Sequence, residues 1–143
     1  MCHENTHIDT ALIYACQNDH EMIVKYLVEY GAYINSKYES NIPLIGACQS
    51  GNEAIVRHLV EHDAYIYKEN SQGSTVLMYA CQNGYESIVK YLVEHGADVN
   101  QINYDGYTTV IYASINRYET IVKYLVEHGT NKTKMSIYIA ILL

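Results

Sequence analysis

A block of twelve residues occurs four times in this chain, and this repetition constrains the fold more than any other feature. The copies begin at Glu21, Glu53, Glu86 and Glu119, which gives a period of about 33 residues. A shorter block, TALIYAC in its first copy, lies upstream of each of them. A fixed period of this length indicates that one small structural unit is stacked several times. The repeats fall at about residues 1–33, 34–65, 66–98 and 99–131.

The longer block has the pattern of an amphipathic helix. In its first copy Ile23, Val24, Leu27 and Val28 line one face, and Gly31 follows in the position of a helix-ending glycine. An acidic residue stands four positions before a basic one in each copy, which marks the side that faces solvent. These pairs are Glu21–Lys25, Glu53–Arg57, Glu86–Lys90 and Glu119–Lys123.

The shorter block predicts a second helix in each repeat. We expect Thr10, Thr75 and Thr108 to cap three of these helices, and Pro43 to occupy the first turn of the other. About ten polar residues between repeats, with a glycine or Ser40 at the turn, predict an extended finger. Since one helix pair cannot bury its apolar stripe alone, the pairs must stack. The expected fold is an all-α solenoid of antiparallel helix pairs joined by β-hairpin-like fingers.

The repeat resembles the ankyrin repeat over nearly the whole chain. The third copy carries the resemblance most clearly, with GSTVLMYACQNG from Gly73 and IVKYLVEHGADVN from Ile88. The resemblance implies an ankyrin-repeat solenoid, four repeats followed by a half-repeat, that acts as a protein interaction module. The chain departs from the family where a histidine is usual on the inner helix, so apolar packing must replace its hydrogen bonds. The residues at this position are Ile13, Ile45, Met78 and Ile111.

The second repeat is the least regular. Asp63 replaces the glycine that ends the longer helix in the other repeats, and the preceding finger is one residue short. An aspartate tolerates a left-handed backbone, but less well than glycine. We expect this junction to be the weakest in the stack. Amide exchange as slow over residues 42–63 as in the third repeat would contradict that expectation.

The last residues, 132–143, are expected to form a capping half-repeat, because they echo the shorter block after a shortened finger. A cap usually has a polar outer face, whereas this segment is almost entirely apolar. Its exposed apolar residues would be Ile139, Ile141, Leu142 and Leu143. Two interpretations stay open: the chain is a fragment of a longer array, or this end associates with a second copy. Light scattering on the purified chain would separate monomer from dimer.

Composition excludes several classes of function. The chain has 143 residues, of which 49% are hydrophobic and 17% are charged, as expected for one globular domain over residues 1–143. It contains no long apolar run and no signal-like N-terminus, so we expect a cytoplasmic protein that binds no membrane. The formal net charge of −7 disfavours binding to nucleic acid.

Cysteine and histidine are frequent, but their positions do not indicate a metal site or a cofactor. Cys16, Cys48 and Cys81 share one position in successive repeats, which stack about 10 Å apart. This separation is too large for a shared zinc ion or for a disulfide, so we expect buried, unpaired thiols. Repeated residues spread along a stack instead of converging on one point, and no catalytic motif occurs. We therefore expect a protein that is not an enzyme.

Resemblance to ankyrin proteins places a binding surface on the concave face, formed by finger tips and inner helices. The candidates are positions that vary between repeats: Tyr38, Glu39, Asn41, Gln49, Glu69, Gln72, Gln82, Asn83, Ile102, Tyr104, Asp105, Tyr107, Ile115 and Asn116. The tyrosines of the fourth repeat would be anchors for a protein or peptide partner, or would simply pack against neighbouring fingers. The alternative function is a structural spacer, or part of a longer ankyrin array with no dedicated ligand.

All sixteen aromatic residues are tyrosine, and the repeat divides them. Tyr26, Tyr91 and Tyr124 share a position with His58 on the longer helix. On the shorter helix the corresponding set is Tyr14, Tyr79 and Tyr112, with Gly46 in the second repeat. We expect a notch at Gly46 that is either filled by a neighbouring ring or open as a small pocket.

Overall fold

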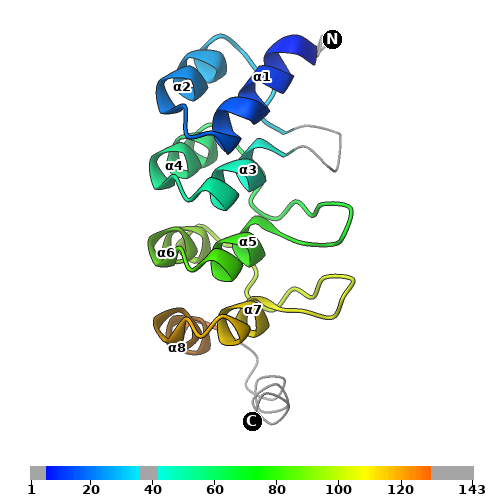
Figure 1. Ribbon diagram of the computed structural model, residues 1–143, viewed down its shortest axis with the longest axis vertical. Coiled ribbons are helices and arrows are strands. Elements are labelled where there is room, and N and C mark those ends of the chain that lie inside the picture. The colour runs from blue at the N-terminus through cyan, green and yellow to red at the C-terminus, as the bar shows by residue number, and fades with distance from the viewer. Residues whose placement is uncertain (1–5, 36–41, 130–143) are drawn as a thin grey trace.

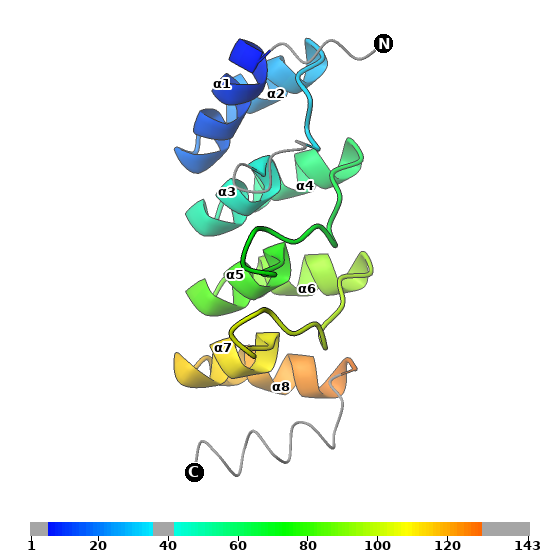
Figure 2. The ribbon, with the colours of Figure 1, turned by 90° about the vertical axis from the view of Figure 1, so that its right-hand side faces the viewer.

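The computed structural model describes residues 6–35 and 42–129, which form helices and no strand. The helices are α1 (Thr6–Gln17), α2 (Glu21–Glu29), α3 (Pro43–Ser50), α4 (Glu53–Glu61), α5 (Val76–Asn83), α6 (Glu86–Glu94), α7 (Thr109–Ile115) and α8 (Glu119–Glu127). They form antiparallel pairs stacked along one axis, which confirms the all-α repeat solenoid (Figures 1 and 2). We call α1, α3, α5 and α7 the inner helices, because they lie between the outer helices and the fingers (Figure 1).

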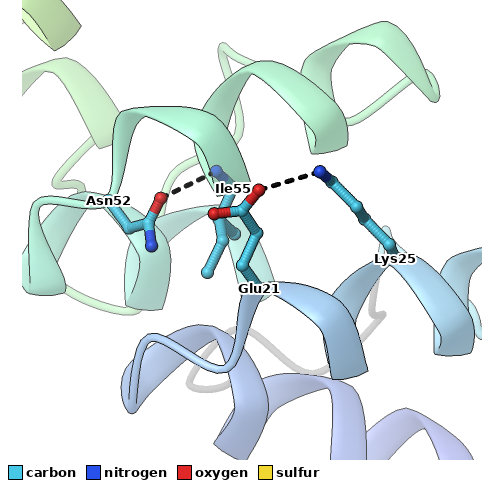
Figure 3. Close-up of polar contacts among 4 residues, drawn as sticks. All are labelled: Glu21, Lys25, Asn52 and Ile55. Carbon is cyan, nitrogen blue, oxygen red and sulfur yellow. Dashed lines mark hydrogen bonds and ion pairs between the residues drawn. The ribbon is translucent and has the colours of Figure 1, made fainter.

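Most of the predicted helix starts are confirmed. The hydroxyl oxygens of Thr75 and Thr108 each accept a hydrogen bond from a backbone N–H three residues on, and Pro43 is the first residue of α3. The sequence reading missed the cap of α4, where Asn52 Oδ1 accepts the N–H of Ile55 at 3.1 Å (Figure 3). Each of these contacts satisfies a donor that the first turn of a helix leaves unpaired.

The predicted start of the first helix is wrong. Helix α1 begins at Thr6, so Thr10 lies inside it instead of capping it. In the third and fourth repeats a glycine turn, at Gly73 and Gly106, precedes the capping threonine and stops the helix from extending backwards. No glycine or proline precedes Thr10 within α1, so helical geometry continues for one more turn.

The core is one continuous seam between the helix pairs. Equivalent leucines of successive inner helices, Leu12, Leu44 and Leu77, are fully buried or nearly so. The three cysteines described by the structure lie in the same seam as buried free thiols, as predicted. Burial raises the pKa of Cys16 to about 12 and also raises the pKa of Cys48 and Cys81. These thiols are therefore protonated and unreactive while the protein is folded.

The outer helices carry a row of ion pairs. Three of the four predicted pairs, Glu21–Lys25, Glu53–Arg57 and Glu86–Lys90, have bonds of 2.7–2.8 Å and are partly exposed (Figure 3 shows the first). Two of the cations also lie over a tyrosine of the next repeat: Arg57 over Tyr91 at 4.4 Å and Lys90 over Tyr124 at 5.8 Å. The row therefore links neighbouring repeats as well as marking the solvent side.

The irregular second repeat adopts the expected backbone. Asp63 has a φ of +68°, in the left-handed region, where the other repeats have glycine. Its carbonyl oxygen accepts a hydrogen bond from Asn35 Nδ2 at 2.8 Å, so this strained turn is tied to the segment that leads out of the first helix pair. The predicted half-repeat over 132–143 lies outside the described residues, as do the self-association surface and residues 36–41 of the shortened finger.

Candidate partner-binding surface

Each described finger turns around one asparagine. Asn70 Oδ1 accepts the backbone N–H groups of Gln72 and Ser74 at 2.9 and 3.0 Å. In the next repeat Asn103 Oδ1 accepts from Asp105 and Tyr107 in the same way, at 3.1 and 2.9 Å. An asparagine side chain that bonds to the backbone two and four residues later builds a tight turn without help from a strand.

The same two asparagines connect the fingers to the inner helices. Asn70 Nδ2 donates to Tyr79 Oη at 2.8 Å, and Asn103 Nδ2 donates to Tyr112 Oη at 2.8 Å. These bonds explain the tyrosine of the third and fourth repeats at this position, since phenylalanine would remove the hydroxyl acceptor of each amide. The sequence reading did not single out Asn70 or Asn103. A signal was present, because each stands nine residues before its tyrosine.

The candidate amide residues at the ends of the inner helices are two glutamines and two asparagines, and only the asparagines bond to their own helix. Gln49 and Gln82 are exposed. Asn83 and Asn116 are also exposed, but their Nδ2 atoms donate to the carbonyl oxygens of Tyr79 and Tyr112, four residues earlier, at 2.8 and 2.9 Å. These two asparagines therefore help to finish their own helices.

The fourth finger presents most of the predicted aromatic and apolar candidates. Ile102, Tyr104, Asp105 and Tyr107 are all exposed, and Ile115 is exposed on the adjoining inner helix. Of the two roles predicted for the tyrosines, packing against a neighbouring finger is observed for Tyr104, and the role as a partner anchor stays a prediction. Tyr104 packs over Gly73 of the neighbouring finger, where an added Cβ would come within 2.9 Å of the ring, yet 76% of its surface is exposed.

The third and fourth fingers also contact each other through polar groups. Gln101 Nε2 donates to Glu69 Oε1, and the N–H of Tyr104 donates to the carbonyl oxygen of Gln72 at 3.0 Å. The candidates Glu69 and Gln72 are exposed beside these contacts. The remaining predicted candidates, Tyr38, Glu39 and Asn41, lie outside the described residues.

Two adjoining pockets lie between the fingers and the inner helices. The first has a volume of about 230 Å³ and is lined in part by Gly46, with Gln17, Gln49, Gln72 and Tyr79 among its other lining residues. Of the two alternatives predicted for this notch, the open pocket is therefore the one observed. Gly46 also allows a close approach, since a Cβ there would be 2.9 Å from Gln17 Cγ.

The second pocket lies one repeat further along the stack. It has a volume of about 200 Å³ and is lined by Gln72, Ser74, Met78, Tyr79, Gln82 and Tyr112. Gln72 and Tyr79 line both pockets, so the two polar pockets adjoin each other and share these side chains. We call this pair of pockets the amide groove.

The described residues contain no cluster of three or more histidine, cysteine or acidic side chains able to hold a metal ion. Among the helices whose positions are described, none has the length and apolar character needed to cross a membrane. The amide groove is lined mainly by amide and hydroxyl side chains, so it can form hydrogen bonds with a ligand.

Comparison with known families identifies the repeat. A family model described as "Ankyrin repeats (3 copies)" matches residues 1–70 and 44–136. The chain belongs to the ankyrin repeat family. Ankyrin repeats are generally protein–protein interaction modules and are typically not enzymes. A comparison with curated proteins gave no match.

Proposed function

We propose that this ankyrin repeat protein binds a protein or peptide partner on the surface formed by its fingers and inner helices, and that it has no enzymatic activity of its own. One observation carries the proposal: the amide groove adjoins the exposed fourth finger, because Gln72 lines both pockets of the groove and its carbonyl oxygen accepts the N–H of Tyr104. A polar groove flanked by exposed aromatic rings is typical of binding surfaces.

The chemistry of the surface limits the partner. The net charge of −7, with exposed Asp105 and Glu69 on the fingers, favours a partner that is neutral or basic. We propose that it acts in the cytoplasm, where a reducing environment suits the buried free thiols. Repeats at about 1–33, 34–65, 66–98 and 99–131 would form one domain that presents this surface.

The test compares a double variant, Tyr104→Ala with Tyr107→Ala, with an outer-helix control. Tyr26 is a suitable control because 65% of its surface is exposed on α2, away from the fingers. Proximity labelling in the source cell, followed by mass spectrometry, should show partners that the finger variant loses and Tyr26→Ala keeps. Thermal unfolding must show that both variants fold, since Tyr107 packs edge-on against Tyr112 at 5.4 Å.

Retention of every partner by the finger variant would contradict the proposal. It would favour the alternative, a structural spacer or a section of a longer ankyrin array with no dedicated ligand.

A further inference from the structure

The direction of one hydrogen bond gives the amide groove a specific chemistry. Both backbone contacts of Asn70 Oδ1 are with N–H donors, so this atom must be the amide oxygen and not the nitrogen. The other amide atom is then the NH₂ group, and it donates to Tyr79 Oη. The hydroxyl oxygen of Tyr79 is the acceptor in this contact, so its own proton must point elsewhere.

The fourth repeat gives the same result. Asn103 Oδ1 accepts two backbone N–H groups, so its NH₂ group donates to Tyr112 Oη and, at 3.3 Å, to Ser74 Oγ. Neither tyrosine hydroxyl donates to any acceptor within the described part of the chain. Both line the amide groove, Tyr79 in both pockets and Tyr112 in the second. The groove therefore holds two phenolic O–H donors, one repeat apart.

The spacing of these donors indicates the shape of a ligand. Successive inner helices pack about 10 Å apart. In a polyproline II helix, residues i and i+3 lie on the same side and are separated by about 9.3 Å. Their carbonyl oxygens would each reach one tyrosine hydroxyl. Proline residues in such a segment bring no N–H group that would need an acceptor in the groove.

We propose that the amide groove binds a proline-rich segment in the polyproline II conformation, whose carbonyl oxygens at i and i+3 accept hydrogen bonds from Tyr79 and Tyr112. Basic residues beside the prolines would face the exposed carboxylate of Asp105 and the acidic surface as a whole. The proposal rests on the proposed binding function and names the class of partner.

The probe is a fluorescent peptide of nine consecutive prolines with a lysine at each end. A peptide of the same length and charge, with glycine and serine in place of proline, is the control for non-specific attraction. We expect the full chain to bind the proline peptide more tightly than the control, because polyproline II is already formed before binding.

Two variants of the third repeat test the donor. Tyr79→Phe removes the hydroxyl and should weaken binding of the proline peptide by roughly threefold to tenfold, the effect of one lost hydrogen bond. Asn70→Asp keeps the tyrosine but reverses the bond: the carboxylate can accept the two backbone N–H groups and also the tyrosine proton. It should weaken binding by a similar factor while the finger stays folded.

Matched controls separate this effect from charge and from general loss of tyrosine. Ser87→Asp adds the same charge at an exposed position on the outer helix α6, and Tyr26→Phe removes an exposed hydroxyl from α2. Neither should change the affinity for the proline peptide. Circular dichroism and thermal unfolding should show that all four variants fold.

Equal binding of the proline and glycine–serine peptides, no binding of either, or full affinity in Tyr79→Phe and Asn70→Asp would each overturn the inference. The proposed function would survive these results if Tyr104→Ala with Tyr107→Ala still lost protein partners in the cell. The proposed function itself would fail if the finger double variant kept every protein partner, which is a separate measurement.

Discussion

Two glycines at the ends of inner helices serve as contact points between repeats. Gly51 and Gly84 have φ values of +79° and +77°, so each ends its helix in the left-handed conformation. The ring of a tyrosine from the next repeat lies directly over each of them. A Cβ at Gly51 would be 2.5 Å from Tyr85, and one at Gly84 would be 2.6 Å from Tyr118. Glycine is therefore required for two independent reasons.

We predict that Gly84→Ala lowers the free energy of unfolding by about 2–4 kcal/mol. Of this, about 1 kcal/mol comes from the left-handed backbone, and the remainder comes from displacing the Tyr118 ring. Gly96→Ala is the matched control, since Gly96 has a φ of +94° but nothing lies within 4 Å of its Cβ position. It should cost only about 1 kcal/mol. Urea unfolding measures both, and equal losses would contradict the role of the ring.

At the scale of elements, the series of contacts between a cation and the tyrosine of the next outer helix is interrupted at the second repeat. His58 occupies the position of Tyr91 and Tyr124, so the preceding cation, Lys25, faces an imidazole instead of a phenol ring. His58 Nε2 is buried and has no hydrogen-bond partner in the described structure. Burial lowers the pKa of His58, and the nearby positive charges of His62 and Lys25 lower it further, against weaker opposition from Glu61 and Glu29.

The lowered pKa predicts the pH dependence of stability. Because the folded-state pKa of His58 lies below the ordinary value of about 6.5, the unfolded chain takes up the proton first as the pH falls. The contribution of His58 to stability is therefore complete above pH 6.5 and is lost as the pH falls below it. Urea unfolding between pH 7.5 and 5 should show a decline that is smaller in His58→Tyr.

The same variant should also be more stable at pH 7. A tyrosine at this position would receive Lys25 as Tyr124 receives Lys90, and an interaction of this kind contributes about 0.5–1 kcal/mol. His62→Gln is a useful comparison, because it removes a histidine from the same helix end without adding a tyrosine that could receive Lys25. Identical pH profiles for the native protein and His58→Tyr would show that other groups control acid sensitivity.

At the scale of the whole molecule, residues at the same position of different repeats differ in how much of their surface is exposed to solvent. Helix α2 lies at one end, and its stacking side has no described helix beyond it (Figures 1 and 2). Ile23 is 50% exposed there, whereas Ile88, at the same position of the third repeat, is 2% exposed. Tyr26 and Tyr91 show the same contrast, at 65% and 5%.

Replacing the isoleucine at this position by alanine should therefore lower the free energy of unfolding by different amounts in different repeats. We predict that Ile88→Ala lowers the free energy of unfolding by about 2–5 kcal/mol, because it leaves a cavity between repeats. Ile23→Ala should cost less than half as much, since half of its surface is already in water. Chemical denaturation at pH 7 measures both. Equal losses would mean that something covers α2 in solution.

The sequence alone was sufficient to predict the architecture of stacked helix pairs. The period, the amphipathic stripes and the capping residues predicted the helix pairs, the stack, the buried thiols and the ion-pair row, because each depends on residues close in sequence or on the same position in the next repeat. The start of α1 was missed for a related reason: capping is a local competition, and a threonine stops a helix only where the backbone before it turns away.

Only the tertiary structure decided the chemistry of the candidate surface. The helix-ending role of Asn83, the packing of Tyr104 on Gly73 and the orientation of the Asn70 amide all depend on which atoms meet across a turn or between two repeats. The sequence predicted a notch at Gly46 and a set of framework tyrosines. It could not predict that Tyr79 Oη and Tyr112 Oη accept hydrogen bonds beside a groove, because the direction of a hydrogen bond is set by every other bond that its two partners make.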